Sequence, residues 1–229
     1  SSANYTYTSK YFKQTANIAL GGSSSNLYTQ IGKSSTAYFN GTYDGNSKTI
    51  SGIYLSTSSS IAGTFNRLGS NGTIKNLGII SSTVRSTSTT EAGSLGAICG
   101  INLGTIQNCY NKGVAVTGPS GVGGICGKNQ ITDSYNTGAI KFSGSGTWYA
   151  YGGIVGWNDG SVNATATQVY RCYNTGTING CQYVGGVAGT NEHSARVFYS
   201  YNRNSVSGTR FVGGLVGVNN QEGYIRNCY

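Results

Sequence analysis

The stretch that decides the fold runs from Gly152 to Asn158 and reads Gly-Gly-Ile-Val-Gly-Trp-Asn. It recurs with small changes, so that five copies begin at Gly96, Gly123, Gly152, Gly185 and Gly213. These starting points are 27, 29, 33 and 28 residues apart. A repeat of this length is typical of a solenoid, in which each coil buries its apolar face only against its neighbours.

A second block follows the glycines and ends in a Cys-Tyr or Ser-Tyr pair, usually followed by Asn. Its copies occupy residues 106–111, 131–136, 169–174, 197–202 and 225–229. A third, shorter segment surrounds Ala115, Ile140, Ile178 and Val206. Three short segments rich in Val, Ile and Tyr, separated by Gly and Asn corners, predict an all-β fold, a parallel β-helix with about three short strands per coil.

Residues at equivalent positions of successive repeats form columns, and these columns differ in their expected roles. Gly-Gly suits either a corner with positive φ or tight packing where no side chain fits. The repeated Asn residues suit corners and hydrogen-bonded stacks along the axis, which we favour over an array of ligand sites. Ile106 and Cys109 have an odd separation, so a bulge or bend is expected between them. The recurring tyrosine forms an aromatic ladder, whose direction, inward or outward, stays open.

Composition and charge limit the function. Fifteen Lys and Arg against six Asp and Glu give a net charge of +9, but the bases are scattered. Weak attraction to anionic polymers follows, whereas specific nucleic-acid binding would need a denser basic stripe. No apolar run approaches the roughly 20 residues of a membrane span. Because the chain starts with Ser and contains no Met, we expect a fragment of a longer protein whose flanking domains are its partners.

At this point the residues resemble a known family. Gly-Gly-Leu-Val-Gly-x-Asn at 213–219 and Ile-x-Asn-Cys-Tyr at 225–229 are similar to the GLUG repeat of bacterial surface proteins. The segments 11–20 and 39–53 resemble the sequence that precedes such repeats, which also occur near the N-terminus of immunoglobulin A-cleaving metalloproteases. The resemblance implies an extracellular, secreted or wall-attached, adhesin-like protein with a right-handed β-helix. It implies no catalytic residues, and His193 is the only His for a zinc motif that needs two.

The domain organisation follows from these matches. We expect one β-helix domain over 1–229, with capping or first coils in 1–60 and GLUG-like coils in 61–229. The insertion at 161–168 should bulge out as a loop. Five of the six cysteines occupy two repeat columns in which Ser or Leu can substitute, and Cys181 is unmatched. We therefore expect free, buried thiols rather than disulfides, although Cys99 and Cys126 lie close enough in adjacent coils for a bridge to be conceivable.

An enzyme would need carboxylates in pairs, either to flank a glycosidic bond or to hold calcium. Only Asp159 and Glu192, which follow the column Asn in successive coils, are placed to converge. They would repel each other unless a cation or Arg joined them, so we expect a solvated turn. Accordingly, no catalytic residue, metal site or cofactor is predicted.

Aromatic side chains give the stronger indication of binding. Trp157 occupies a variable column, held by Ile101, Lys128, Thr190 and Val218 in other coils, and is therefore expected to be exposed. Together with Trp148, Tyr149 and Tyr151 it is predicted to stack on a sugar ring. In the alternative interpretation, these rings only cover the side of the solenoid.

These observations predict a non-catalytic adhesive or stalk module of a cell-surface or secreted protein. Its partners would be host or bacterial glycans or anionic wall polymers, bound through a side face. Two alternatives stay open. One is a carbohydrate-active β-helix enzyme, a lyase or glycosidase, and the other is a purely structural spacer.

Overall fold

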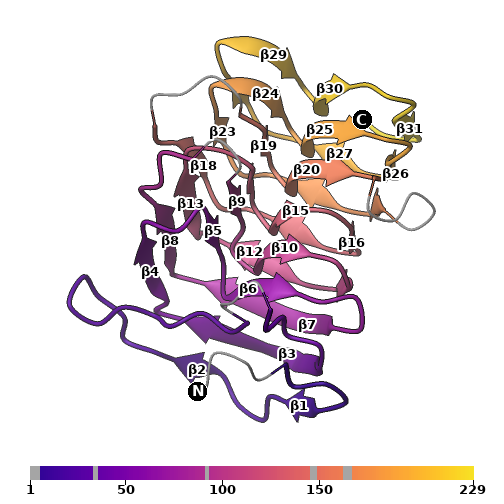
Figure 1. Ribbon diagram of the computed structural model, residues 1–229. Coiled ribbons are helices and arrows are strands. Elements are labelled where there is room, and N and C mark those ends of the chain that lie inside the picture. The colour runs from indigo at the N-terminus through magenta and orange to yellow at the C-terminus, as the bar shows by residue number, and fades with distance from the viewer. Residues whose placement is uncertain (1–5, 33–35, 91–92, 145–148, 162–166) are drawn as a thin grey trace.

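The chain forms a parallel β-solenoid, seen in a computed structural model that describes residues 6–32, 36–90, 93–144, 149–161 and 167–229. The described residues contain no helix, and about seven coils stack so that the two ends of the chain lie at opposite ends of the stack (Figure 1). The predicted all-β solenoid is therefore confirmed. Each of the three sequence blocks in a coil forms β-strands. Two of the blocks are divided by a bend into two strands each.

Sheet A has 13 strands and is built from the Cys-Tyr-Asn block. Its first half consists of β1 (Tyr11–Lys13), β11 (Thr105–Gln107), β16 (Ile131–Thr132), β21 (Gln168–Tyr170), β26 (Arg196–Phe198) and β31 (Tyr224–Arg226). Its second half consists of β2 (Ile18–Ala19), β12 (Tyr110–Lys112), β17 (Tyr135–Asn136), β22 (Tyr173–Asn174) and β27 (Tyr201–Asn202). The long strands β3 (Thr42–Ser51) and β7 (Thr73–Ile80) run through both halves.

Three sheets of six strands complete the coils. Sheet B consists of β6 (Phe65–Leu68), β10 (Cys99–Asn102), β15 (Cys126–Lys128), β20 (Val155–Asp159), β25 (Ala188–Glu192) and β30 (Val216–Asn219). Sheet C consists of β4 (Tyr54–Thr57), β8 (Thr83–Ser86), β13 (Ala115–Gly118), β18 (Ile140–Phe142), β23 (Ile178–Asn179) and β28 (Val206–Ser207). Sheet D consists of β5 (Ile61–Ala62), β9 (Ser94–Leu95), β14 (Val122–Gly123), β19 (Tyr151–Gly152), β24 (Gln182–Gly185) and β29 (Arg210–Gly213).

The double glycines mark the corner between sheets D and B. A Cβ on Gly123 would lie 2.0 Å from the Cys126 carbonyl oxygen, and one on Gly124 would lie 2.4 Å from the Asn136 side chain. Neither glycine has positive φ. Of the two roles expected for Gly-Gly, tight packing is therefore the one observed at this corner.

Asparagine side chains form buried ladders along the axis, as predicted. Asn136 donates to Asn174 at 2.7 Å, and Asn174 donates to Asn202 at 2.8 Å. In the other column, Asn158 donates to Asn191 at 2.7 Å. Because these amides also bind carbonyl groups of the corners, they satisfy buried polar groups of the backbone.

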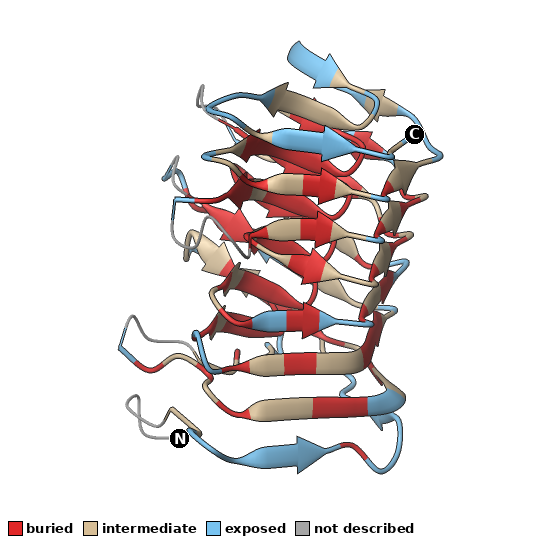
Figure 2. Ribbon diagram, turned by 90° about the vertical axis from the view of Figure 1, so that its right-hand side faces the viewer, coloured by how far each residue is buried: buried red, intermediate tan, exposed pale blue. Residues whose placement is uncertain are grey.

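The expected bend divides sheet A into its two halves. One residue per coil adopts a left-handed conformation there, with φ of 50° to 55° at Asn76, Asn108, Asp133, Arg171, Tyr199 and Asn227. Because of this residue, both Ile106 and Cys109 point into the core, where each is 1% exposed. Figure 2 looks onto the first half of sheet A, where the middle residue of successive strands is buried and its neighbours are less so.

Two predictions concern segments rather than single residues. Most of the insertion at 161–168 lies outside the described residues, as 162–166 are not described. The division at residue 60 stays a prediction, although β1 and β2 both pair with β3 in the first coils.

Candidate binding surface and charged cluster

The tyrosine ladder lies on the outer side of sheet A. Cys109 and Asn111 are buried, whereas Tyr110 between them is half-buried, as strand alternation requires when the ring points outward. Successive rings lie parallel with their centroids 4.9–5.1 Å apart, from Tyr110 through Tyr135, Tyr173 and Tyr201 to Tyr229. The question that the sequence left open is thus answered.

The stacking of the ladder determines which parts of the rings are accessible. Tyr110 packs over Gly78 of β7, where a Cβ would lie 2.2 Å from the ring. Partial burial, and then the neighbouring phenols, raise the pKa of Tyr135. Since the faces of the inner rings are covered by each other, the ladder offers ring edges and hydroxyl groups to a ligand rather than open aromatic faces.

The predicted sugar-binding aromatics are not brought together on the surface. Tyr149 is 1% exposed and Tyr151 is 0% exposed, so the prediction that their rings stack on a sugar is wrong. Tyr151 lies in sheet D and packs into the core, where its hydroxyl donates to the Pro119 carbonyl at 2.6 Å. Trp157 is half-buried on sheet B between Lys128 and Thr190, and Trp148 lies outside the described residues.

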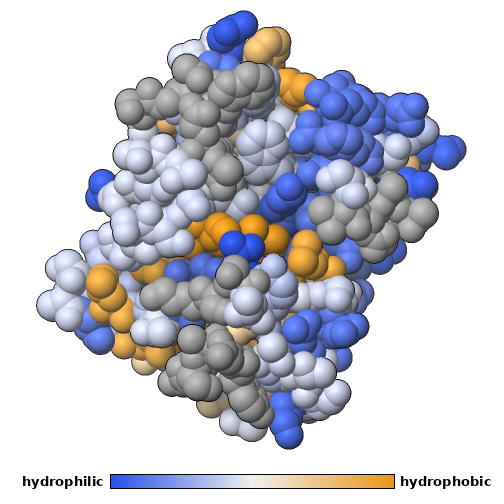
Figure 3. Space-filling view, viewed as in Figure 1, coloured by the Kyte–Doolittle hydropathy of each residue, from blue (hydrophilic) through white to orange (hydrophobic). Residues whose placement is uncertain are grey.

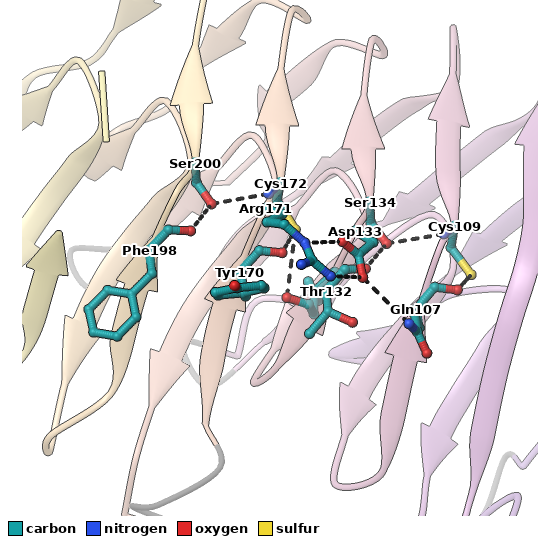
Figure 4. A network of polar contacts seen from close by, with 11 residues as sticks. Gln107, Cys109, Thr132, Asp133, Ser134, Tyr170, Arg171, Cys172, Phe198 and Ser200 are labelled. Carbon is teal, nitrogen blue, oxygen red and sulfur yellow. Dashed lines mark hydrogen bonds and ion pairs between the residues drawn. The ribbon is translucent and has the colours of Figure 1, made fainter. Parts of the chain in front are cut away.

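A polar network follows the bend of sheet A (Figure 4). Arg171 forms two hydrogen bonds to Asp133 of the preceding coil, at 2.5 and 2.9 Å, and its guanidinium lies 4.6 Å from the centroid of the Tyr170 ring. Gln107 donates to the same carboxylate at 3.4 Å. The hydrogen bonds from Arg171 and its positive charge lower the pKa of Asp133. The repeat pattern gives no sign of this pair, because Arg171 lies 38 residues from Asp133 in the sequence.

The outer side of sheet A also carries aromatic and basic residues beside this network. Tyr170 and Tyr199 meet edge to face with their centroids 5.5 Å apart. Arg203 lies 5.1 Å from the Tyr201 ring centroid. Phe198 and Arg196 of β26 are both half-buried. In Figure 3, hydrophilic residues predominate at the upper right, the side on which β25, β26 and β31 lie in Figure 1.

A second cluster surrounds Asp159 at the end of β20. This side chain accepts from Lys128 at 2.9 Å, from His193 Nδ1 at 2.9 Å and from the backbone N–H of Ser161 at 2.9 Å. Burial alone would raise the pKa of Asp159, but the hydrogen bonds from Ser161 and Lys128 outweigh it and lower the pKa to about 2. Lys128 thus supplies a cation for Asp159, and the expected solvated turn is wrong for this residue, which is buried.

Glu192 lies beside Asp159 in the register of sheet B. Burial, and then the negative charge of Asp159, raise the pKa of Glu192, whereas His193 and Lys128 oppose this shift. Asp159, Glu192 and His193 each offer one ligand atom, and these atoms lie within 4.8 Å of one another. A divalent cation would have to compete with Lys128 for Asp159, so the cluster is better described as an ion-pair network than as a preformed metal site.

Two hollows lie near these features. An open one of about 410 Å³ is lined by Gly160, Ser161, His193, Ser194, Gln221 and Glu222. A second one, of about 280 Å³, lies beside sheet C and has Arg85, Pro119 and Tyr149 in its lining, with hydroxyl groups of Ser and Thr. Among the described residues, neither lining contains a pair of free carboxylates.

The six cysteines are free, as predicted, but only four of them are buried, because Cys181 and Cys228 are half-buried. Cys99 and Cys126 are paired in register between β10 and β15 without a bridge. Burial raises the pKa of Cys109 and of Cys172 to about 12, which makes these thiols poor nucleophiles. Thiol-based catalysis therefore finds no support at these two positions.

Comparisons with known proteins agree with this architecture. No protein-family model matches the chain. Halomucin from Haloquadratum walsbyi is 36% identical over 102 residues, which are 44% of this chain and 1% of that protein. The crystal structure of a candidate immunoglobulin A1 protease from Bacteroides ovatus has a TM-score of 0.51 and 19% identity, with 97% of this chain and 60% of that chain covered. At this identity the likeness concerns the fold alone, and the chain spans only part of both proteins.

The described residues include no helix that could cross a membrane. The structural neighbour is named as a candidate immunoglobulin A1 protease, and immunoglobulin A-cleaving proteases are one class in which GLUG repeats occur. The names of the two similar proteins do not mention the repeat itself. The family resemblance therefore stays a prediction.

Proposed function

We propose that this chain is a non-catalytic module of a secreted or surface-attached protein, and that it binds an extended glycan along the outer side of sheet A. The observation that carries the proposal is the in-register stack of sheet A. It repeats an outward tyrosine, with its ring edge and hydroxyl group, once per coil, and arginines lie over tyrosine rings of sheet A in two of the coils. A polymer that lies along the axis can meet equivalent groups in several coils, and many weak contacts then add up.

The extracellular location is supported by the name of one similar protein. The name Halomucin refers to mucins, which are extracellular glycoproteins. The composition agrees, since the chain is rich in small polar residues and the repeat resembles one found in surface proteins.

The environment of the carboxylates favours binding over cleavage. A glycosidase needs one carboxyl group that donates a proton and another that acts as nucleophile or base. Asp159 and Glu192 are the described pair closest to this arrangement, but the oxygens of Asp159 already accept from Lys128, His193 and Ser161. Asp159 is also 7% exposed, which leaves little of it available to a substrate.

A carbohydrate-active enzyme remains the second candidate, and one observation favours it. The pKa of Asp159 is lowered and that of Glu192 is raised, and carboxyl pairs with opposed shifts can divide the roles of base and acid. Release of new sugar ends from a polysaccharide by the purified chain, abolished in Glu192→Gln, would support this candidate.

The binding proposal is tested on a glycan array with the purified chain and two variants. Phe198→Ala removes a half-buried ring from sheet A, and Trp157→Ala removes one from sheet B. We expect binding to extended glycans that Phe198→Ala weakens and Trp157→Ala leaves unchanged. The opposite pattern would contradict the proposed surface and place the site at Trp157 on sheet B, one of the four aromatics that the sequence predicted. Absence of binding to every glycan would contradict the proposal and favour a spacer.

A further inference from the structure

We infer that the surface formed by β21, β26 and β31 binds an anionic polysaccharide, whose carboxylate or sulfate groups pair with Arg196 and Arg226. This inference rests on the proposed function and names the class of glycan. The surface is called the arginine face below. It consists of the outward residues Tyr170, Arg196, Phe198 and Arg226, and Arg203, which follows β27, lies beside it on the other half of sheet A.

The register of sheet A assembles this face from three coils. Arg196 pairs with Gln168 on one side and with Tyr224 on the other. Phe198 pairs in the same way with Tyr170 and Arg226. The second row therefore reads Tyr170, Phe198, Arg226 across successive coils, and Figure 4 shows Tyr170 and Phe198 side by side on the same face of the sheet.

The charges of this face are not balanced. Asp133 is paired with Arg171, so that these two charges cancel locally. Among the described residues, no carboxylate lies within ion-pair distance of Arg196, Arg203 or Arg226. Three arginines without an acidic partner create a positive potential along one side of a chain whose net charge is +9.

The geometry fits groups that recur along an extended polymer. Arg196 and Arg226 lie one coil apart and two residues apart along the strand direction, since Arg226 pairs with Phe198. Strand spacing and rise then separate their Cα atoms by about 8 Å. Arginine binds carboxylate and sulfate through two parallel N–H groups. Phe198, between the two, offers an apolar ring to a sugar.

The aromatic residues favour a polysaccharide over a single-stranded nucleic acid. Nucleic acids bind such surfaces by stacking bases on open ring faces. Here one face of Tyr170 is covered by Arg171 at 4.6 Å, and the edge-to-face contact with Tyr199 crowds the ring further. The ladder rings cover each other. The faces of Tyr170 and of the inner ladder rings are thus covered against a base, whereas no carboxylate of the described residues occupies the arginines.

The test compares defined polymers on the same purified chain. The probes are polygalacturonate, its methyl ester, dextran sulfate, dextran and an oligo-dT strand, each titrated at two salt concentrations. We expect polygalacturonate or dextran sulfate to bind, with affinity falling as salt rises, and the methyl ester and dextran to bind about tenfold more weakly. Comparing the two acidic polymers distinguishes carboxylate from sulfate. Stronger binding of oligo-dT than of both acidic polymers would overturn the inference.

Two double substitutions distinguish binding by the arginine face from binding by the net charge of the whole chain. Arg196→Gln with Arg226→Gln removes two charges from the face, and Arg85→Gln with Lys141→Gln removes two from exposed positions of sheet C. We expect the first pair to weaken binding about tenfold and the second pair to have little effect. Equal weakening by both pairs would overturn the inference. Binding of neutral glycans alone would leave the proposed function standing and reject this one, whereas no binding to any glycan rejects both.

Discussion

Ser134 joins two coils, because its hydroxyl accepts the backbone N–H of Cys109 at 3.1 Å and donates to the carbonyl of Thr132 at 2.7 Å. The same arrangement recurs two repeats later, where Ser200 accepts from the backbone N–H of Cys172 at 3.1 Å. The buried position just after the bend of sheet A is thus occupied by Cys and Ser in alternate coils. Each Ser hydroxyl accepts a backbone N–H group that would otherwise be buried without an acceptor (Figure 4).

Replacement of Ser134 by Ala should lower the free energy of unfolding by about 1–3 kcal/mol, because the N–H of Cys109 would be left buried without an acceptor. Denaturant unfolding measures the change. Thr105→Ala, at an exposed position of β11, serves as the control and should change the free energy by less than about 0.5 kcal/mol. Equal stability of Ser134→Ala and the wild type would show that the hydroxyl has no such role.

The thiols should divide into two classes in an alkylation experiment. Cys99, Cys109, Cys126 and Cys172 are buried, whereas Cys181 and Cys228 are half-buried. We expect iodoacetamide at pH 8 to modify only the latter two in the folded chain, and all six after denaturation. Mass spectrometry of peptides reads the outcome. Failure of a pair to react even in denaturant would reveal a disulfide and contradict the free thiols.

The tyrosine ladder should contribute to stability through ring stacking. Tyr135 lies between Tyr110 and Tyr173, with centroid distances of 5.0 and 4.9 Å. Tyr135→Ala removes both contacts and should cost roughly 1–3 kcal/mol, at 0.5–1.5 kcal/mol for each stacked pair. Tyr54→Ala on sheet C, which also replaces a half-buried tyrosine, should cost less. If both variants unfold at the same denaturant concentration, the stacking contributes nothing beyond burial.

Asp44 should make stability fall in acid. The hydrogen bond from Asn76 is the main cause that lowers the pKa of Asp44 to about 2, and those from the Asn46 backbone and Tyr11 add to it. Because the folded pKa lies below the unfolded value of about 3.9, this contribution is present above pH 4 and is lost as the pH falls towards 2. Asp44→Asn should lose stability at pH 7 and show a flatter profile between pH 4 and 2. A profile identical to that of the wild type would refute this role.

Glu192 should make stability depend on pH in the opposite direction. Burial and the charge of Asp159 raise its pKa, so its stabilising contribution is present at low pH and is lost as the pH rises through the folded pKa. Glu192→Gln is therefore expected to be more stable than the wild type at pH 7, and thermal unfolding measures the difference. Lys128→Gln should be less stable, because it leaves Asp159 without its nearest ammonium group. A destabilised Glu192→Gln would mean that the carboxylate is needed in its charged form.

Much of the fold could be predicted because each coil repeats the same physical constraints. The bend between Ile106 and Cys109 followed from an odd spacing between two apolar residues, and the left-handed Asn108 now accounts for it. The Asn ladders and the free cysteines followed from columns that neighbouring coils share. Whether the ladder tyrosines point inward or outward could not be predicted. A single bend in the strand reverses the face of the sheet on which every later side chain lies.

The binding surface was harder to predict because it depends on residues outside the repeat pattern. Tyr149 and Tyr151 precede a glycine block, and nothing in their own sequence indicates that sheet D turns them into the core. Arg196 and Arg226 occupy equivalent blocks in successive coils but different outward rows. The aligned blocks already place Arg226 beside Phe198, but they do not tell which face of sheet A the two side chains take.

The central claim is that the chain binds a glycan on sheet A without cleaving it. The most direct measurement is to incubate the chain with polygalacturonate, determine the affinity by titration, and then determine the polymer's length by size-exclusion chromatography. We predict saturable binding, weakened by Arg196→Gln with Arg226→Gln, and an unchanged polymer length. A shortened polymer would identify an enzyme, and no binding of this or any other glycan would contradict the account.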